Sequence, residues 1–539
     1  MKVYEAIADQ LRKYGVSTVF GVMGDANMFY VDRFVRECGG RYVAAAHEAG
    51  ATLMALGYAS VSGKVAVASV TQGPALANAL PALLEGARAR LSMVLIAGDI
   101  STSRTHLQSL AQRELVLATG AGFEQARAAD SVGFDLRNAF RRAFSERRPV
   151  VFNVPAEFLW ADTSETSAPL RFHERRATAT DSQDLEDAVG VVANAKRPIV
   201  LAGRGSLDPK ARAAVLAFAR RIGAPVMTTL KAKDLFLGED EAIGVMGTVS
   251  SAEAIDALVV SDCIIGFGAS LTSNTTSKGT LVRGKRVVLV NDDPADLDGN
   301  HPPDAGVVGD SASVAARMIH WLDEAEIPSS GFCQEEVVRT AIATYASRHP
   351  DASLSGPNDV RSVLRRVHHM IGPERMLVTD GGRYLGEAWT SIAVSDPRLF
   401  VLGHNSGAIG LGVSHAIGAS IAEPCRPALL VTGDGGFMMG GLNEFNTAVR
   451  QKLDLIVLMF NDSSYGSEHV QFRDRGMDPS LATFEWPDFA PIADALGGIG
   501  VTVRSLDDLV HVEGVLHRRD RPVLIDVKMD PDRMPPPPW

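Results

Sequence analysis

The segment from Ala428 to Gly466 constrains the fold more than any other part of the chain. An apolar run ends at Gly433-Asp434-Gly435-Gly436, a helix-like stretch follows, and a second apolar run ends at Asn461-Asp462-Ser463-Ser464. This order predicts a strand, a helix and a second, parallel strand. Because such a unit brings both strand ends to one edge of the sheet, Asp434 and Asp462 are expected to meet there. Two carboxylates beside a glycine-lined helix N-terminus suit Mg²⁺ that carries a diphosphate.

Two alternatives stay open at this point. The Gly-Asp-Gly-Gly sequence alone is equally compatible with a strand that simply ends in a turn. The second strand end favours the metal site, although both Asn461 and Asp462 could supply its oxygen ligand.

The whole chain alternates apolar strand-like runs with helix-like runs, which predicts an α/β fold of three doubly wound parallel-sheet domains. A length of 539 residues exceeds one domain. Polar stretches without periodicity predict linkers, so we place the domains at residues 1–165, 183–345 and 358–530. The proline-rich tail Pro531–Trp539 is expected to lie outside the core and to pack across a surface.

Composition excludes several classes of protein. A net charge of −11 argues against nucleic-acid binding, and no apolar run reaches the roughly 20 residues that span a membrane. The four cysteines have no ligand-like spacing and are expected to be reduced thiols. The first residues predict an amphipathic helix rather than a signal peptide, and we expect a cytoplasmic protein.

The paired strand ends resemble the fingerprint of thiamine diphosphate (ThDP) enzymes, Gly-Asp-Gly followed by Asn-Asn or Asn-Asp. This family includes acetolactate synthase, pyruvate oxidase, pyruvate decarboxylase and benzaldehyde lyase. The resemblance implies that ThDP and Mg²⁺ are the cofactors. It implies that the side chains of Asp434 and Asp462 and the main-chain carbonyl of Ser464 bind the metal, because the family's ligand is the second residue of the pair. The Gly440-Gly441 region adds one residue to the usual spacing.

Glu48 opens an apolar helix in the sequence His-Glu-Ala-Gly-Ala. A glutamate there could simply be favoured by the helix dipole. The sequence that follows, GYASVSGKVAVASVTQGPALAN, resembles the family's GYAR-x-x-GK…TSGPGATN. The resemblance implies that Glu48 activates the cofactor through N1′ of its aminopyrimidine ring. It also implies cofactor contacts at Pro74, Asn78 and Gln112.

Two glycine-rich turns of the last domain resemble other cofactor-binding segments of the family. In the sequence from His404 to Gly410, Ile409 would be the apolar wedge under the cofactor, and the Gly407 carbonyl would accept a hydrogen bond from its 4′-amino group. The remaining residues expected to contact the cofactor, chiefly its diphosphate, are Gly382, Arg383, Tyr384, Gly435, Gly436 and Gly466.

Two further acids resemble catalytic residues of the family's decarboxylases. Asp25 lies in FGVMGDAN, which resembles FGxPGDxN, and Glu468 follows the second metal ligand. Alternatively, Asp25 caps a helix and Glu468 is a solvated charge. His106 lies near the place of a histidine pair in those enzymes.

The central domain is the least informative part. Acetolactate synthases bind FAD there and oxalyl-CoA decarboxylase binds ADP, and Gly244–Val249 resembles synthase sequence. However, Gly203-Arg204-Gly205 is too short for a dinucleotide fingerprint, and Tyr465–Arg475 does not match the synthases. FAD is therefore a possible cofactor that we do not favour.

The resemblance implies an enzyme that acts on a 2-oxo acid, as a decarboxylase or as an acetolactate synthase-like carboligase. It also implies a homodimer or homotetramer, because the family's cofactor lies between the first domain of one subunit and the third domain of another. Two alternatives are a nicotinamide-dependent dehydrogenase, which the missing GxGxxG motif disfavours, and a non-catalytic ThDP-binding homologue, which Glu48 disfavours.

Overall fold

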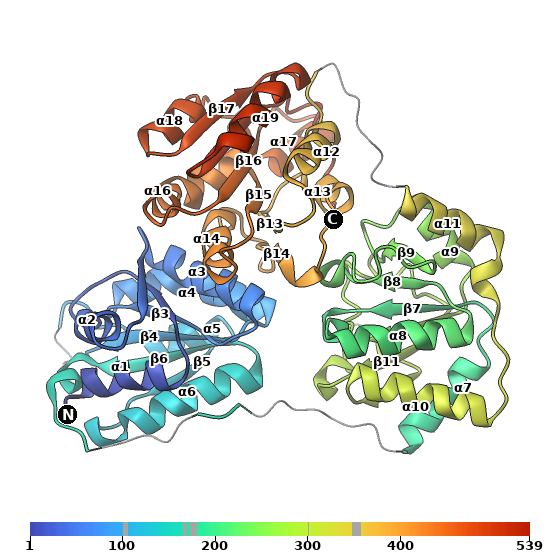
Figure 1. Cartoon of the computed structure of the whole chain (residues 1–539), viewed down its shortest axis with the longest axis horizontal. Coiled ribbons are helices and arrows are strands. Elements are labelled where there is room, and N and C mark those ends of the chain that lie inside the picture. Colours follow the sequence, from blue (N-terminus) through green and yellow to red (C-terminus); the bar gives the residue numbers. More distant parts are fainter. Residues whose placement is uncertain (101–105, 165–169, 173–180, 300, 348–356, 539) are drawn as a thin grey trace.

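The structure is a computed structural model that describes residues 1–100, 106–164, 170–172, 181–299, 301–347 and 357–538. Within these residues the chain forms three lobes, each built on a sheet with helices on both faces (Figure 1). Each sheet has six strands, and all paired neighbours are parallel. The three sheets confirm the predicted fold class.

The first and third sheets share one strand order. The first runs β2-β1-β3-β4-β6-β5 and the third runs β14-β13-β15-β16-β18-β17. The strands of the first are β1 (Thr18–Gly21), β2 (Arg41–Ala44), β3 (Ala66–Val70), β4 (Met93–Asp99), β5 (Gly122–Gln125) and β6 (Pro149–Pro155). Those of the third are β13 (Met376–Thr379), β14 (Phe400–Leu402), β15 (Ala428–Gly433), β16 (Leu455–Asn461), β17 (Ile499–Val503) and β18 (Val523–Lys528).

The central sheet has a different order, β12-β11-β10-β7-β8-β9, which is the strand order typical of dinucleotide-binding domains. Its strands are β7 (Pro198–Ala202), β8 (Val226–Thr228), β9 (Ala242–Val245), β10 (Cys263–Phe267), β11 (Arg286–Asn291) and β12 (Ala305–Val308).

Helices connect the strands of each sheet. The first lobe contains α1 (Val3–Lys13), α2 (Met28–Arg36), α3 (Glu48–Ser62), α4 (Pro74–Ala89), α5 (Gln112–Ala118) and α6 (Val132–Glu146). The central lobe contains α7 (Gln183–Ala193), α8 (Pro209–Ile222), α9 (Ala252–Val260), α10 (Ser311–Glu324) and α11 (Glu336–Ala346). The third contains α12 (Val360–Ile371), α13 (Leu385–Ser391), α14 (Gly412–Ala422), α15 (Asp434–Gly436), α16 (Leu442–Arg450), α17 (Gly466–Asp474), α18 (Phe489–Ala495) and α19 (Leu509–Arg518).

A π-helical turn at Phe437–Gly441 joins α15 to α16 directly after the Gly-Asp-Gly-Gly segment. A π-helical turn holds one residue more than an α-helical turn. It therefore absorbs the additional residue that the sequence showed in the Gly440-Gly441 region.

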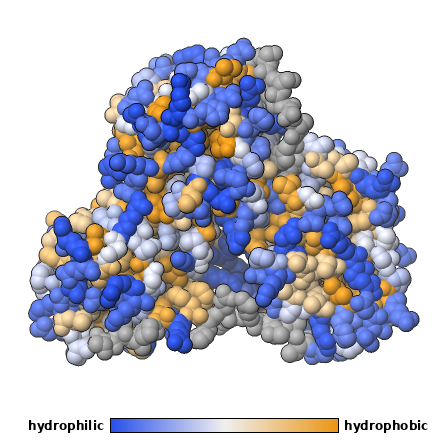
Figure 2. Space-filling view, in the orientation of Figure 1, coloured by the Kyte–Doolittle hydropathy of each residue, from blue (hydrophilic) through white to orange (hydrophobic). Residues whose placement is uncertain are grey.

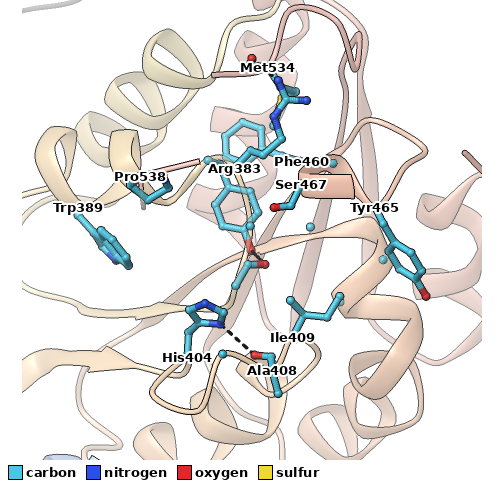
Figure 3. Close-up of a pocket in the computed structure, with 18 of the residues that line it drawn as sticks. Arg383, Trp389, His404, Ala408, Ile409, Phe460, Tyr465, Ser467, Met534 and Pro538 are labelled. Carbon is cyan, nitrogen blue, oxygen red and sulfur yellow. Dashed lines mark hydrogen bonds between the residues drawn. The ribbon is translucent and has the colours of Figure 1, made fainter. Parts of the chain in front are cut away.

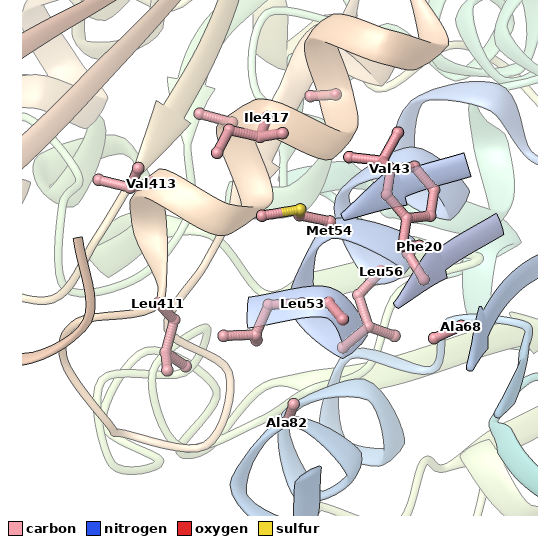
Figure 4. Packing of buried hydrophobic residues seen from close by; sticks show 14 of the residues in the cluster. Phe20, Val43, Leu53, Met54, Leu56, Ala68, Ala82, Leu411, Val413 and Ile417 are labelled. Carbon is pink, nitrogen blue, oxygen red and sulfur yellow. The ribbon is translucent and has the colours of Figure 1, made fainter. Parts of the chain in front are cut away.

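The first and third lobes share one hydrophobic core, in which α3 packs against α14. Figure 4 shows Leu53 and Met54 of α3 and Val413 and Ile417 of α14 in this core. The contact is close because Gly418 faces α3: a Cβ atom there would lie 1.8 Å from the Met54 carbonyl oxygen. A side chain at this position would separate the two lobes.

Buried carboxylates reinforce the contact between these lobes. Glu444 of α16 accepts hydrogen bonds from the N–H groups of Ala46 and His47, each at 3.1 Å. Glu85 of α4 accepts from the N–H groups of Asn405 and Ser406 at 2.9 and 2.7 Å. The turn before Glu48 and the turn after β14 are thus each held by the opposite lobe.

The central lobe is tied to the third by a buried ion pair. Lys233 Nζ lies 2.5 Å from Asp234 and donates to the Ile392 carbonyl at 2.8 Å, while Asp234 accepts from the Val394 N–H at 3.0 Å.

Figure 2 shows small apolar patches scattered among polar residues, with the surface hollowed where the three lobes meet. Among the described residues, no helix has the length and apolar character needed to cross a membrane.

Candidate active site

A cavity of about 880 Å³ lies at the carboxyl edge of the third sheet, where it faces the central lobe. Ligands of open α/β sheets bind at this edge. The turns after β13, β14, β15 and β16 form one side of the cavity, part of which Figure 3 shows. Central-lobe residues on the other side include Leu230, Met246, Thr248 and Asn274.

The two predicted metal ligands meet in this cavity. Asp434 and Asp462 both line it and are only 2% and 6% exposed. Burial, together with the charge of Asp462, raises the pKa of Asp434 to about 7, and burial also raises the pKa of Asp462. A divalent cation between the two carboxylates would offset both the burial and the repulsion, so this site fits Mg²⁺.

The contacts of Asn461 and Asp462 distinguish these two candidate ligands. Asn461 donates to the Asp526 carboxylate at 2.9 Å, beneath the sheet edge. The Asp462 carboxylate instead lies at the cavity and accepts from the Ser464 N–H at 3.1 Å and its hydroxyl at 2.8 Å. Ser463, which lies between Asp462 and Ser464, has a φ of 55°, a left-handed conformation that turns the chain. The geometry therefore favours Asp462.

Three turns beside the carboxylates require glycine, because neighbouring side chains pack directly against the backbone there. A Cβ atom would lie 2.8 Å from the Tyr465 ring at Gly435, 2.2 Å from the Tyr384 ring at Gly382, and 2.8 Å from Arg383 at Gly466. Each of these glycines lies at a strand-to-helix turn, where N–H groups and the helix dipole favour an anion. The three turns fit a diphosphate bridged to a metal ion.

Asp380 organises this cradle, although the sequence alone had not singled it out as a site residue. Its buried carboxylate accepts from the N–H groups of Gly381 at 2.7 Å, Gly410 at 3.1 Å and Gly412 at 3.1 Å. It therefore locks the turn after β13 to the turn after β14. The one available signal was an acid at the strand end, in Thr-Asp-Gly-Gly.

The turn after β14 carries the predicted apolar wedge. Ile409 lines the cavity and packs against Gly381, where a Cβ atom would lie 2.8 Å from the Ile409 side chain. Gly407 has a φ of 85°, which a residue with a side chain rarely adopts. His404 Nδ1 lies 3.0 Å from the Ala408 carbonyl oxygen and closes the turn (Figure 3).

Glu468 lines the same cavity from the first turn of α17. Its side chain is exposed, whereas the predicted metal-binding carboxylates Asp434 and Asp462 are buried. The cavity thus has a carboxylate at its solvent side.

The predicted residues of the first lobe gather at the carboxyl edge of their own sheet. Glu48 begins α3 after β2, is half-buried, and accepts from Asn78 at 3.0 Å. Pro74 is the first residue of α4.

Asp25 is exposed in the turn after β1, and Asn27 rather than Asp25 occupies the N-cap of α2. Among the described residues, none from the first lobe lines the cavity around Asp434.

Models of thiamine pyrophosphate enzymes (thiamine pyrophosphate is ThDP) match this chain in three consecutive parts. The N-terminal TPP binding domain matches residues 1–119, the central domain residues 185–318 and the C-terminal TPP binding domain residues 380–527. The chain belongs to the thiamine pyrophosphate enzyme family.

Relatives of this thiamine pyrophosphate enzyme align over nearly its whole length. Acetolactate synthase of Mycobacterium leprae is 26% identical, covering 97% of this chain and 86% of that protein. The acetolactate synthase large subunit of Haemophilus influenzae is 23% identical, with 98% and 94% covered. Sulfoacetaldehyde acetyltransferase of Alcaligenes xylosoxydans xylosoxydans is 26% identical, with 94% and 88% covered. The prediction of an acetolactate synthase-like ThDP enzyme is thus confirmed.

The C-terminal tail of this thiamine pyrophosphate enzyme covers one end of the cavity. Arg383 donates to three tail carbonyls, those of Pro531 at 2.7 Å, Met534 at 2.6 Å and Pro535 at 2.9 Å. Met534 is buried in the core of the third lobe. The tail therefore packs across a surface as predicted, but one of its residues joins the core because Arg383 fastens the backbone.

Gln112 is fully engaged within the first lobe. Its side-chain oxygen accepts from the Gly73 N–H at 2.6 Å, and its amide nitrogen donates to Gly98 at 2.9 Å and to Asn153 at 2.6 Å. These bonds fix the turn before Pro74. His106, the other residue considered in this region, is exposed and accepts from the Gln108 N–H at 3.2 Å.

The glycine turn of the central lobe faces backbone rather than open space. The N–H groups of Gly203 and Gly205 donate to the Phe267 and Gly268 carbonyls at 2.9 and 3.0 Å. These amides are therefore already bonded, whereas a dinucleotide-binding turn directs its amides at the pyrophosphate. Our expectation that FAD is not required stays a prediction.

Proposed function

We propose that this protein is a ThDP- and Mg²⁺-dependent enzyme that breaks the C–C bond next to the keto group of a 2-oxo acid and transfers the remaining carbon unit to a second carbonyl compound. The observation that carries the proposal is the convergence of glycine-rich turns and two buried carboxylates on one cavity. Two of the relatives are named acetolactate synthase and one is named as an acetyltransferase, which supports carbon-unit transfer.

Bound ThDP supplies a carbon nucleophile and accepts the electron pair of the broken bond. The side chains of Asp434 and Asp462 and the Ser464 carbonyl hold Mg²⁺. N–H groups of the turns at Gly382–Tyr384, Gly435–Gly436 and Gly466 bind the diphosphate. Ile409 supports the ring system, and the Gly407 carbonyl accepts from its amino group.

Glu48 holds a proton at N1′ of the cofactor's pyrimidine ring. A carboxyl group at that nitrogen would favour the imino tautomer of the ring, and that tautomer would supply the base for C2. The Asn78 amide, 3.0 Å from the Glu48 carboxylate, orients this acid.

A second copy of the chain completes the site. Within one chain, no described residue of the first lobe lines the cavity. The connections after β1 and β4 meanwhile expose apolar side chains, with Met23 at 51% and Leu107 at 98%. Burying them against the third lobe of a partner would bring Glu48 to the cofactor. The active assembly is thus a homodimer, or a homotetramer built from two such dimers.

Glu468 supports a second outcome of the same reaction. A carboxyl group on the cavity wall, in its protonated form, could donate a proton to the carbon from which CO₂ has left, and this would give an aldehyde instead of a ligated product. The four cysteines are free thiols, and we place the enzyme in the cytoplasm.

A panel of 2-oxo acids, each supplied alone and with a second carbonyl compound, tests the proposal. We expect ThDP-dependent CO₂ release with at least one acid, and product analysis then separates aldehyde from ligated product. Carbon dioxide release that is equal with and without ThDP, or oxidation of a hydroxy acid with NAD instead, would contradict the proposal.

A further inference from the structure

Trp486 contacts the metal site although it lies in the connection between α17 and α18. Its indole N–H donates to Asp434 Oδ2 at 2.8 Å. An indole nitrogen can only donate, so Trp486 cannot bind a cation itself. It can only orient the carboxylate that does.

A row of aromatic rings fixes the indole. The Trp486 ring stacks on Phe484 with 4.7 Å between ring centroids and an interplanar angle of 21°. Phe484 in turn meets the edge of Tyr465, also at 4.7 Å. Tyr465 directly follows Ser464, so the row begins beside one metal ligand and ends on another.

The backbone links the same two segments. The Tyr465 N–H donates to the Ala482 carbonyl at 2.9 Å, and the Phe484 N–H donates to the Ser463 carbonyl at 2.8 Å. The segment from Ala482 to Trp486, which we name the aromatic clamp, therefore pairs with the metal-binding turn after β16. It joins that turn to Asp434, which follows β15.

We propose that Trp486 is a positioning residue that holds Asp434 at a set place opposite Asp462 and Ser464, and thereby favours Mg²⁺ over larger divalent cations. This inference rests on the proposed ThDP–Mg²⁺ site. The indole N–H holds the Asp434 carboxylate, and the backbone pairing of the clamp fixes the turn that carries Asp462 and Ser464. Mg²⁺ demands near-ideal octahedral geometry at short distances, whereas Ca²⁺ accepts longer and less regular ones. Loosening the clamp should therefore weaken Mg²⁺ binding more than Ca²⁺ binding.

The test is calorimetric titration of Mg²⁺, and separately Ca²⁺, into the metal-free full-length protein with saturating ThDP. In Trp486→Phe the ring stack is kept and the N–H donor is lost. We expect Mg²⁺ affinity to fall by about 10- to 100-fold, the usual range for an outer-shell partner, with a smaller loss for Ca²⁺. Phe484→Leu keeps the donor and loosens the stack, so its loss should be intermediate.

Trp321→Phe is the matched control, because Trp321 donates an equivalent bond to the Asp181 carboxylate at 3.0 Å on the central lobe. It should leave both affinities unchanged. Unchanged Mg²⁺ affinity in both clamp variants would overturn the proposal. Equal losses of Mg²⁺ and Ca²⁺ affinity, together with a lower melting temperature of the metal-free protein, would overturn it as well. If Trp486→Phe does not fold, Phe484→Leu decides alone by the same ratio. If the wild type itself binds no ThDP under any metal condition, the proposed function fails first.

Discussion

At the scale of single residues, Glu48 and Glu468 are expected to fail at different steps. Glu48→Gln cannot hold the proton at N1′, so exchange of the C2 hydrogen of bound ThDP with deuterium should slow by a factor on the order of 10²–10⁴. Glu468→Gln should leave this exchange nearly intact, lower product formation and shift output from aldehyde towards ligated product. Quenched-flow NMR of the cofactor and product analysis measure both effects. Equal slowing of exchange in the two variants would remove Glu468 from the later step.

Metal removal should have a pH-dependent effect through Asp434. Its pKa is raised to about 7, so between its ordinary value near 4 and pH 7 the folded state keeps a proton that the unfolded state has lost. The free energy of unfolding of the metal-free protein should therefore fall as pH rises through this window. In EDTA, Asp434→Asn should melt higher than the wild type at pH 8, with a smaller difference at pH 5. A difference that does not change with pH would contradict this assignment.

At the scale of elements, the alternating apolar runs predicted three parallel sheets, and the two strand-end motifs predicted the unit formed by β15 and β16. The edge strands β5, β9 and β12 have four residues each, which leaves too short a stretch for periodicity to identify. The strand-end motifs around Asp434 and Asp462 were readable because their chemistry is local. Asp380, Glu444 and Trp486 were not, since their roles arise from contacts with residues that are distant in sequence.

Glu444 offers a test of how one lobe positions the activating residue of another. It is 1% exposed and accepts the N–H groups of Ala46 and His47, directly before Glu48. Glu444→Ala removes both of these hydrogen bonds to a charged group, each of which contributes about 1.5–3 kcal/mol. We expect a lower melting temperature and slower C2 hydrogen exchange, both partly restored in Glu444→Gln. Exposed Glu324→Ala is the control, and normal exchange in Glu444→Ala would show that the contact is only structural.

At the scale of the whole molecule, the proposed function requires active sites that two subunits share. Glu48→Gln and Asp434→Asn should each be inactive alone. The two variants are mixed, dissociated and reassembled, so that half of the dimers contain one chain of each kind. In such a dimer, one site combines Glu48 of one chain with Asp434 of the other and is intact. Activity should then recover to about a quarter of wild type. No recovery, in a mixture that light scattering shows to contain dimers, would place the site within one chain.

The most direct test of the proposed ThDP–Mg²⁺ site is calorimetric binding of ThDP to the full chain, with Mg²⁺ and with EDTA. We expect saturable binding in Mg²⁺ at one ThDP per chain, a strong loss in EDTA, and a melting temperature that rises with ligand concentration. Asp434→Asn should abolish the effect of Mg²⁺. Absence of ThDP binding under every metal condition would contradict the proposed site. Binding in EDTA and in Asp434→Asn that is as strong as in the wild type with Mg²⁺ would contradict it too.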